Sequence, residues 1–304
     1  MKHIFIINPI AGAKDISATL IPQIKALKDI DYRIEMTEYV GHAREIARKY
    51  ASTYEEIRIY ACGGDGTLNE VIIGSYGYPQ VEIACVPCGS GNDFIKVFGK
   101  REDFFNLEQL VLGKSIEVDI MKVNDKMSAS ICSVGFDANV AYGIKKYKRI
   151  PLLGGRMAYN MSVIENYFKP LGTYLEIEVD GKQYHGDYLL LCVANGTTYG
   201  GGFKSAPMAK VNDGIIDIVL VKKINRLFIL KLIAKYATGN HIINEEVIPA
   251  FKPYMTYIKG ERIRINSSKD FTLNIDGECE KINSLAIEIL KKEMKFVLPQ
   301  GMVY

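Results

Sequence analysis

The sequence of 304 residues contains no run that is long and apolar enough to cross a bilayer, which argues against a membrane-spanning helix. It has no Gly-x-x-x-x-Gly-Lys-Ser/Thr motif, so it does not belong to the P-loop class of proteins. The net charge is only +3, and we therefore expect no nucleic acid as a partner. Near the amino terminus only four apolar residues precede Asn8-Pro9, which predicts a buried strand rather than a signal peptide. These absences predict a cytoplasmic protein.

Cysteine and histidine are also too scattered to predict a metal or redox site. Most of the six cysteines lie in strand-like apolar runs, which is typical of reduced thiols in a core. Cys85 and Cys88 have the C-x-x-C spacing, but no second pair exists to complete a zinc site. His42 and His185 have no acidic or cysteine neighbours in a recognisable pattern. We assign no function to any of these residues.

The chain is long enough for two domains, and its first third alternates strand-like and helix-like segments. This order predicts an α/β domain with a parallel sheet and helices on both faces. In such a sheet, ligands bind beyond the carboxyl ends of the strands. The expected strands are residues 4–7, 32–36, 57–62 and 81–86, and the expected helices are 17–27, 42–51 and 68–75.

After about residue 117 the pattern becomes rich in short strands separated by Gly, Asn and Asp turns, such as Asp180-Gly181. This pattern predicts an antiparallel β-sandwich or barrel with two inserted helices, at 155–168 and 225–237. The expected strands are residues 116–123, 127–134, 174–179, 188–194, 215–221, 262–265, 271–275 and 287–290, with a short strand at 294–299.

Two glycine-rich segments are the strongest chemical signal in the chain. The first elbow is Gly63-Gly64-Asp65-Gly66-Thr67 and the second is Gly89-Ser90-Gly91-Asn92-Asp93; each follows an apolar run. Glycine permits positive φ and lets an anion approach main-chain N–H groups. An acid in each elbow fits this role when a divalent cation lies between the carboxylate and a phosphate. The elbows therefore predict a polyphosphate with a divalent cation, and hence phosphoryl transfer.

Each of these segments also has a purely structural interpretation. The first elbow could be a tight turn in which Asp65 forms an Asx cap, and the second could supply only a helix N-cap. Asn8-Pro9 is a frequent turn, although it falls on the same predicted sheet edge as the elbows. Asp276-Gly277, between two strand-like runs, is usually a hairpin turn. Of the two acids at positions 276 and 278, one could instead accept a proton while the other binds a metal ion.

The combination of motifs resembles the diacylglycerol kinase catalytic family, especially its soluble bacterial lipid-kinase members. GGDGTLNE begins at Gly63, NPxxG lies upstream and PxGSGNDF lies downstream. Further matches are Asp119, the segment 207–214 and the segment 274–278. The resemblance covers nearly the whole chain, and this order of motifs is highly specific. GGDG alone is shared with NAD kinases and phosphofructokinases.

The resemblance implies an N-terminal three-layer α/β domain, similar to NAD kinase and phosphofructokinase, and a C-terminal antiparallel β-sandwich. It implies that the final strand returns to the first domain, which places residues 1–117 with 293–304 in a nucleotide-binding domain. Residues 118–292 would form the lipid-binding sandwich. The active site would lie in the cleft between the two domains.

The resemblance also implies roles for individual residues. Asp276 matches the general base and acts with Asp65 in catalysis, while Glu278 matches a ligand of Mg²⁺. Asp213, with the backbone carbonyls of Lys210 and Ile215, matches a structural Mg²⁺ site. The expected contacts to ATP are Asn8, Pro9, Gly12, Thr37, Gly63, Gly64, Asp65, Gly66, Thr67, Asn69, Glu70, Gly89, Ser90, Gly91, Asn92 and Asp93.

Two positions depart from the pattern of the family. Ser90 replaces the commoner Thr and keeps the hydroxyl. Ala13 stands where the nearest relatives have a Lys, and Lys14 follows one position later. The resemblance therefore does not carry over a lysine-assisted bridge between Asp119 and Lys96.

The function that the sequence favours is an ATP- and Mg²⁺-dependent lipid kinase, with diacylglycerol as acceptor and phosphatidic acid as product. An NAD kinase-like phosphotransferase is one alternative, but the second elbow has the lipid-kinase form GSGNDF. A catalytically silent regulator that binds nucleotide or lipid is another, and the retained Asp65, Asp276 and Glu278 argue against it.

A lipid substrate implies access to the inner face of the membrane, where we expect the protein to lie peripherally. Residues 145–153 join four cations to an apolar tip and could touch anionic lipid, or could be a solvated helix end entering a buried loop. The segment 199–203 could flex to admit an acyl chain, or be a plain loop. The apolar segment 227–236 is expected to pack on the sandwich. An edge strand could pair with a second copy, so a homodimer remains open.

Overall fold

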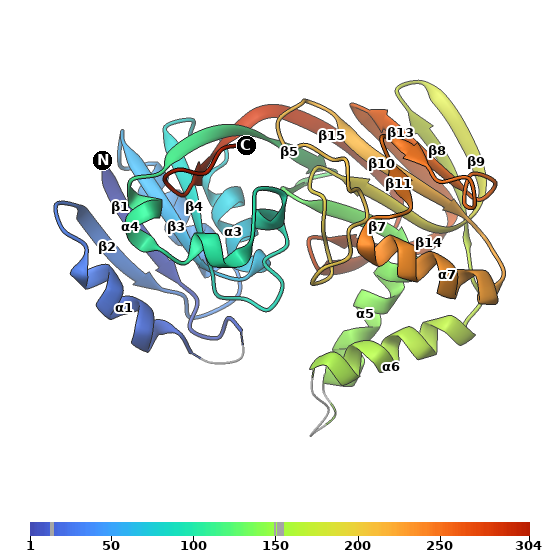
Figure 1. Ribbon diagram of the computed structural model, residues 1–304, viewed down its shortest axis with the longest axis horizontal. Helices are drawn as coiled ribbons and strands as arrows, with labels where there is room; N and C mark the ends of the chain where they lie inside the picture. The colour runs from blue at the N-terminus through green and yellow to red at the C-terminus, as the bar shows by residue number, and fades with distance from the viewer. Residues whose placement is uncertain (13–14, 149, 151–154) are drawn as a thin grey trace. The chain divides into compact units, whose positions relative to one another are not determined.

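The structure is a computed structural model that describes residues 1–12, 15–148, 150 and 155–304 (Figure 1). The chain divides into two compact units. Unit 1 consists of Met1–Ile120, Val211–Gly214 and Leu290–Tyr304. Unit 2 consists of Met121–Lys210 and Ile215–Ile289. The segment 211–214, which the sequence assigned to the second domain, belongs to unit 1 because its backbone bonds to Asp119.

Unit 1 has a parallel sheet in the order β15-β4-β3-β1-β2. Every residue of β1 and β3 is buried, as expected for parallel strands that are covered on both faces. Helices α2 and α3 pack on each other and on these strands. The expected α/β fold is therefore confirmed. The elements are β1 Lys2–Ile7, α1 Ser17–Ala26, β2 Asp31–Met36, α2 His42–Ala51, β3 Ile57–Gly63, α3 Asp65–Ser75, β4 Val81–Pro87, the 3-10 turns η1 Phe94–Val97 and η2 Arg101–Phe104, and α4 Leu107–Val111.

The carboxyl-terminal part of β15 (Glu278–Leu298) completes this sheet. Phe296 pairs with Ile83 of β4, and its side chain is fully buried. Its ring stacks on Phe98 with centroids 5.1 Å apart and meets the ring of Phe94 edge-on at 5.0 Å. Burial of an aromatic ring of this size contributes strongly to stability, so β15 is an integral part of the core of unit 1.

Unit 2 is an antiparallel sheet that folds over on itself. Strand β9 pairs first with β8 and then with β7 and β10, and β14 likewise pairs first with β8 and then with β7. This arrangement confirms the expected sandwich. The strands are β5 Lys114–Val123, which begins in unit 1, β6 Lys126–Ser128, β7 Ile131–Gly135, β8 Thr173–Val179, β9 Lys182–Ala194, β10 Ile216–Lys222, β11 Ile242–Ile243, β12 Glu246–Val247, β13 Met255–Gly260 and β14 Arg262–Ile275.

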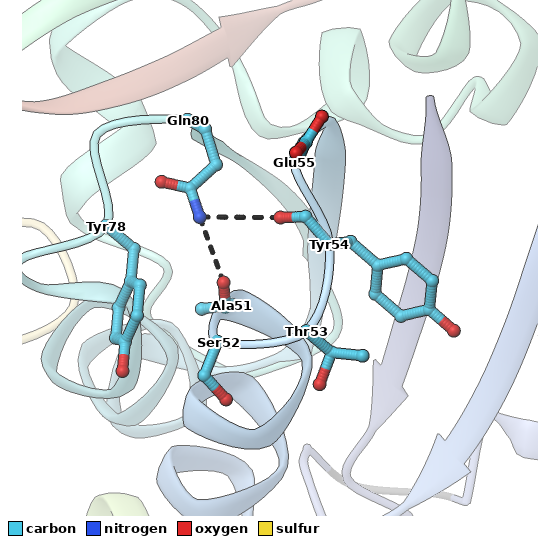
Figure 2. Close-up of a pocket in the computed structure, with 7 residues that line it drawn as sticks. All are labelled: Ala51, Ser52, Thr53, Tyr54, Glu55, Tyr78 and Gln80. Atoms are coloured by element: carbon cyan, nitrogen blue, oxygen red, sulfur yellow. Dashed lines mark hydrogen bonds between the residues drawn. The ribbon is translucent and has the colours of Figure 1, made fainter.

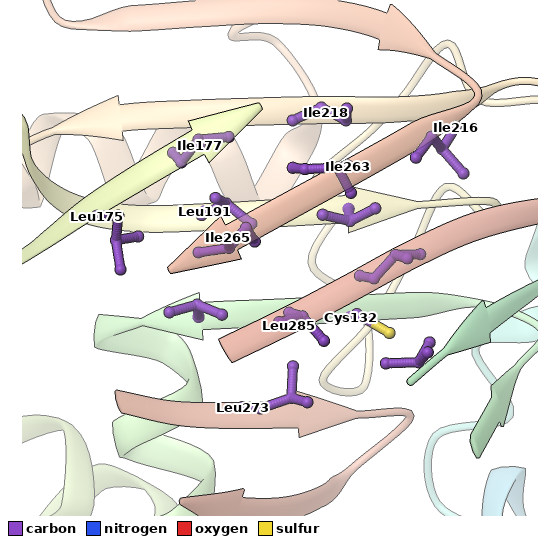
Figure 3. Close-up of a cluster of buried hydrophobic side chains, with 14 of the residues drawn as sticks. Cys132, Leu175, Ile177, Leu191, Ile216, Ile218, Ile263, Ile265, Leu273 and Leu285 are labelled. Carbon is purple, nitrogen blue, oxygen red and sulfur yellow. The ribbon is translucent and has the colours of Figure 1, made fainter. Parts of the chain in front are cut away.

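The inward side chains of these strands form one apolar cluster (Figure 3). Leu175, Ile177 and Val179 of β8 are buried, while the residues between them are exposed or half-buried, as the two-residue period of a strand requires. A second cluster lies on the other side of β9 and β10. There α7 (Arg226–Thr238) buries Ile229, Leu232 and Tyr236.

Five of the expected strands differ from the observed ones. The strand expected at 127–134 is split between β6 and β7. The two strands expected at 262–265 and 271–275 form one strand, β14, whose register shifts between Asn266 and Phe271. The strands expected at 287–290 and 294–299 are both parts of β15. Unit 2 also contains α5 (Phe136–Lys148), which the sequence did not predict, and α6 (Gly155–Phe168), which it did. None of the described helices is long and apolar enough to span a membrane.

Candidate active site

The two elbows follow β3 and β4, which are neighbours in the sheet, and they bond directly to each other. The carbonyl oxygen of Gly63 accepts hydrogen bonds from the backbone N–H of Cys88 at 2.8 Å and of Gly89 at 3.1 Å. The Nδ2 of Asn92 donates to the same oxygen at 3.0 Å. Three donors on one carbonyl hold the second elbow against the end of β3.

The closest approach of the elbows is between Gly64 and Gly89. A Cβ built on Gly89 would lie 2.4 Å from the Cα of Gly64, and a Cβ on Gly63 would lie 2.3 Å from Oγ1 of Thr67. No side chain fits at these distances, so the glycines are required by backbone packing as well as by any ligand. By contrast, nothing lies within 4 Å of a Cβ built on Gly66.

Asp65, in the first turn of α3, forms hydrogen bonds that hold the second elbow in place. Its Oδ1 accepts the backbone N–H of Asp93 at 2.6 Å and that of Phe94 at 3.4 Å. Burial raises the pKa of Asp65, and the charge of the nearby Asp93 carboxylate raises it further. Asp93 in turn forms an ion pair with Lys96 at 2.5 Å. Two close carboxylates with one cationic partner form a donor set that suits a divalent cation.

Residues that follow β1 lie close to both elbows. Nδ2 of Asn8 donates to Oγ1 of Thr67 at 3.0 Å, and Oδ1 of Asn8 accepts the N–H of Ile10 at 3.2 Å. Gly12 has φ +84°, and a Cβ there would lie 2.4 Å from the carbonyl oxygen of Cys88. The structure thus brings Asn8, Gly12 and both elbows together at the carboxyl edge of the sheet of unit 1.

Several features of this edge fit a bound nucleotide and metal. The amino terminus of α3 has no side-chain cap, so its N–H groups suit an anion. Oδ1 of Asn69 and Oδ1 of Asn92 are buried without a hydrogen-bond partner, and amide oxygens of this kind suit a cation or a donor group. Ser90 and Gly66 are exposed beside them. The residues present therefore fit both groups.

Glu70 and Thr37, two of the expected ATP contacts, both bond to backbone groups. Both carboxylate oxygens of Glu70 accept backbone N–H groups at the start of α2, from Gly41 at 2.8 Å and Ala43 at 3.1 Å. Glu70 therefore caps α2, which has no cap of its own. The N–H of Thr37 donates to the carbonyl of Ile7 at 2.9 Å and extends the pairing of β2 with β1.

The cysteines behave as core residues. All six are free thiols, and Cys85 and Cys88 are buried at the end of β4. Burial raises the pKa of both thiols, that of Cys88 to about 12, so they are poor nucleophiles and poor metal ligands.

Asp276 and Gly277 form the two-residue turn between β14 and β15. Their φ angles are +46° and +95°, and Ile275 pairs directly with Glu278, as in a type I′ hairpin. The carboxylate of Asp276 accepts the N–H of Ile131 at 2.9 Å and of Ala129 at 3.2 Å. Asp276 is thus held rigidly, whereas Glu278 is exposed.

The residues of the expected structural Mg²⁺ site lie in and beside the segment 211–214. Asp213 and Lys210 are exposed, and Ile215 is half-buried. No cluster of three or more His, Cys, Asp or Glu side chains suited to a metal occurs among the described residues, but a site built mainly from carbonyls would not form such a cluster.

Asp119 is the residue that organises this segment. Its fully buried carboxylate accepts the N–H of Gly214 at 2.7 Å and the N–H of Lys292 at 2.8 Å. Its own N–H donates to the carbonyl of Val211 at 2.6 Å. Lys96 pairs with Asp93, and Lys14 lies outside the described residues.

The expected membrane contact at 145–153 includes residues 149 and 151–153, which lie outside the described part of the chain. In the segment 199–203, Tyr199 is anchored because its hydroxyl donates to Asp137 at 2.7 Å. The sequence did not single out Asp137, because it lies in no recognisable motif and helix α5, in whose first turn it lies, was itself not predicted. Burial raises its pKa to about 6.

A pocket of unit 1 lies at the other edge of the sheet (Figure 2). It is lined by the end of α2 and by residues that precede β3 and β4, including Tyr54 and Tyr78. Gln80 crosses it and donates to the carbonyls of Ala51 at 2.9 Å and Tyr54 at 3.4 Å. It lies opposite the carboxyl edge, where the elbows are.

Comparison with protein families matches residues 2–123 to the diacylglycerol kinase catalytic domain and residues 130–297 to the YegS C-terminal NAD kinase beta sandwich-like domain. The diacylglycerol kinase of Bacillus subtilis (strain 168) is 30% identical over 284 residues, which cover 91% of this chain and 90% of the relative. The diacylglycerol kinase of Staphylococcus aureus (strain MRSA252) is 29% identical over 278 residues, covering 90% and 84%.

Crystal structures of proteins from Bacillus anthracis str. Sterne share the fold. One superimposes with a TM-score of 0.77 at 24% identity, covering 99% of this chain and 97% of that one. A second, a diacylglycerol kinase, gives a TM-score of 0.72 at 22% identity and covers 99% and 98%.

Proposed function

Since the chain belongs to the diacylglycerol kinase catalytic family and is a lipid kinase, we propose that it transfers the γ-phosphate of ATP to the hydroxyl of diacylglycerol, giving phosphatidic acid. The observation that carries this proposal is the pair of elbows joined through Asp65 at the carboxyl edge of the sheet. Phosphoryl transfer through a loose transition state depends mainly on positioning and on charge neutralisation.

In unit 1, the N–H groups of both elbows and the start of α3 bind the phosphates. The hydroxyls of Thr67 and Ser90 are further donors to phosphate oxygens. Asp65 and Asp93 hold Mg²⁺, with the unpartnered Oδ1 of Asn92 beside them. When bound, Mg²⁺ neutralises charge on the phosphate oxygens.

In unit 2, Asp276 accepts the proton of the lipid hydroxyl. The two backbone N–H groups that donate to its carboxylate fix the position of that carboxylate. A weak base is sufficient because the acceptor hydroxyl loses its proton late in a loose transition state. Glu278, two positions on, is the proposed additional metal ligand, and Asp213 with the carbonyls of Lys210 and Ile215 binds a structural Mg²⁺. The protein acts at the inner face of the membrane.

A transfer assay with γ-labelled ATP tests the proposal against a panel of diacylglycerol, a sphingoid base, phosphatidylglycerol, a prenol and NAD. We expect label in diacylglycerol. Label in NAD alone, or in no acceptor, would overturn the lipid-kinase assignment of this site.

The structure also offers a matched control for Asp276. Asp180 occupies the same kind of turn, with φ +45° before Gly181 at +84°, and its carboxylate likewise accepts two N–H groups, from Glu261 at 2.8 Å and Arg262 at 2.9 Å. Asp276→Asn should bind ATP but lose transfer, whereas Asp180→Asn should remain active. Full activity in Asp276→Asn would exclude it as the base.

A further inference from the structure

Helix α6 has its polar face inward. Ala158, Ser162 and Asn166 lie on one side of the helix and are buried. Oγ of Ser162 donates to the carbonyl of Val140 in α5 at 2.6 Å, and Nδ2 of Asn166 donates to the carbonyl of Asn139 at 3.3 Å. Small side chains and hydrogen bonds therefore help to hold α6 against α5.

The opposite face of α6 is apolar and faces outward. Met157, Met161, Ile164 and Phe168 follow the helical spacing of three or four residues, and they are 56%, 41%, 52% and 73% exposed. A surface helix ordinarily buries its apolar stripe and exposes its polar one. An exposed apolar stripe of this kind indicates a surface that binds a protein partner or a membrane.

The apolar face continues onto the start of α7. The side chain of Arg226 donates to the carbonyls of Tyr167 at 2.9 Å and Lys169 at 3.1 Å, which joins the first residue of α7 to the end of α6. Leu227 and Leu230, the next outward residues of α7, are 78% and 57% exposed. In the view of Figure 1, α6 and α7 lie with α5 below the strands of unit 2.

Positive charge accompanies this surface. Among the side chains that the structure describes, helices α5, α6 and α7 carry four basic and two acidic residues, in a chain whose net charge is only +3. One acid, Asp137, lies at the buried end of α5. The other, Glu165, accepts the hydroxyl of Tyr147 at 2.6 Å and pairs with Lys169 at 2.8 Å and Lys146 at 3.2 Å. The charge around the apolar face is therefore complementary to an anionic surface.

We propose that the outward face of α6, together with Leu227 and Leu230 of α7, binds the surface of an anionic lipid bilayer. The apolar side chains enter the interface and the lysines remain at the level of the headgroups. The inference rests on the proposed function, because a bilayer is where a kinase of long-chain diacylglycerol meets its substrate.

Co-sedimentation of the full chain with vesicles tests this surface. Vesicles contain phosphatidylcholine alone or with one third phosphatidylglycerol. We expect binding to the anionic vesicles to fall about tenfold or more in the Ile164→Gln/Phe168→Gln variant, since each side chain loses apolar contact with lipid. The matched control is Ile243→Gln, because Ile243 on β11 is similarly exposed, at 54%, but is not part of the proposed surface, so this variant should bind normally.

A second measurement separates this proposal from the proposed function. The Ile164→Gln/Phe168→Gln variant should phosphorylate a short-chain diacylglycerol dispersed in detergent at the wild-type rate, but lose activity on diacylglycerol in vesicles. Lack of any kinase activity in the wild type would refute the proposed function without affecting the binding result. Vesicle binding equal to wild type would overturn the surface proposal. So would a wild-type dimer that the double substitution dissociates, since that would identify a second copy as the occupant.

Discussion

The Oδ1 of Asp65 accepts the backbone N–H of Asp93 at 2.6 Å, so the acid of the first elbow fixes the geometry of the second. Asp65→Asn keeps this acceptor and removes the charge. Because burial raises the pKa of Asp65, the ionised carboxylate carries a desolvation penalty in the folded state, and the neutral amide does not carry that penalty. We expect activity to fall about 100-fold or more, with an unchanged or higher unfolding temperature. Asp65→Ala, which loses the acceptor, should lose about 1–3 kcal/mol of stability. Wild-type activity in Asp65→Asn would exclude a catalytic role.

Substitutions at Gly89 and Gly66 can distinguish glycines that backbone packing requires from glycines that ligand binding requires. In Gly89→Ala the new Cβ meets Gly64, so we expect a large loss of stability in thermal unfolding, of the order of 2 kcal/mol or more. In Gly66→Ala nothing is displaced, and the first turn of α3 gains helix propensity. That variant should unfold no earlier than wild type but show a raised KM for ATP. An unchanged KM would remove Gly66 from the nucleotide site.

Glu70 offers a test of the expected ATP contacts. Because its carboxylate caps α2, Glu70→Ala should lower the free energy of unfolding by about 1–3 kcal/mol, while the KM for ATP of the folded enzyme stays near wild type. Denaturant titration and steady-state kinetics at a temperature where the variant is folded give the two quantities. A KM increase with unchanged stability would restore Glu70 to the nucleotide site.

Asp137 predicts an unusual dependence of stability on pH. Its folded pKa of about 6 exceeds the ordinary 3.8, so the folded state binds the proton more tightly than the unfolded state. The carboxylate therefore contributes a penalty that is absent below about pH 4, grows between pH 4 and 6, and is complete above pH 6. Asp137→Asn, which still accepts from Tyr199, should be more stable by about 3 kcal/mol at pH 7.5 and close to wild type near pH 4. Denaturant titrations across this range measure the difference, and a gain that is independent of pH would contradict this account.

The sequence predicted helices α2 and α6 well because their signals are local. Ala43, Ile46 and Tyr50 recur at helical spacing, and all three are buried. Periodicity shows which residues share a face but not which face is inside, and so the outward apolar face of α6 could not be foreseen. Helix α5 was missed because it begins directly after β7 without a separating turn.

Contacts between residues far apart in the chain could not be predicted from the sequence. The sequence predicted two separate strands at 287–290 and 294–299, but β15 is continuous. Between these two ranges Lys292, with φ +58°, donates its N–H to Asp119, 173 positions away. The elbows were predictable since each is a contiguous motif. The capping role of Glu70 was not, because its partners lie on another helix. Asp276 and Asp180 have nearly the same turn geometry, so only the surrounding motif distinguishes them.

The return of β15 to unit 1 has a consequence for biosynthesis. Phe296 pairs beside β4 and packs with Phe94 and Phe98, yet it leaves the ribosome after all of unit 2. The amino-terminal unit therefore cannot complete its sheet before Phe296 has been synthesised. Until then Phe94, Phe98 and the edge of β4 lack their partner, and a chain truncated before residue 290 should leave this unit incompletely folded.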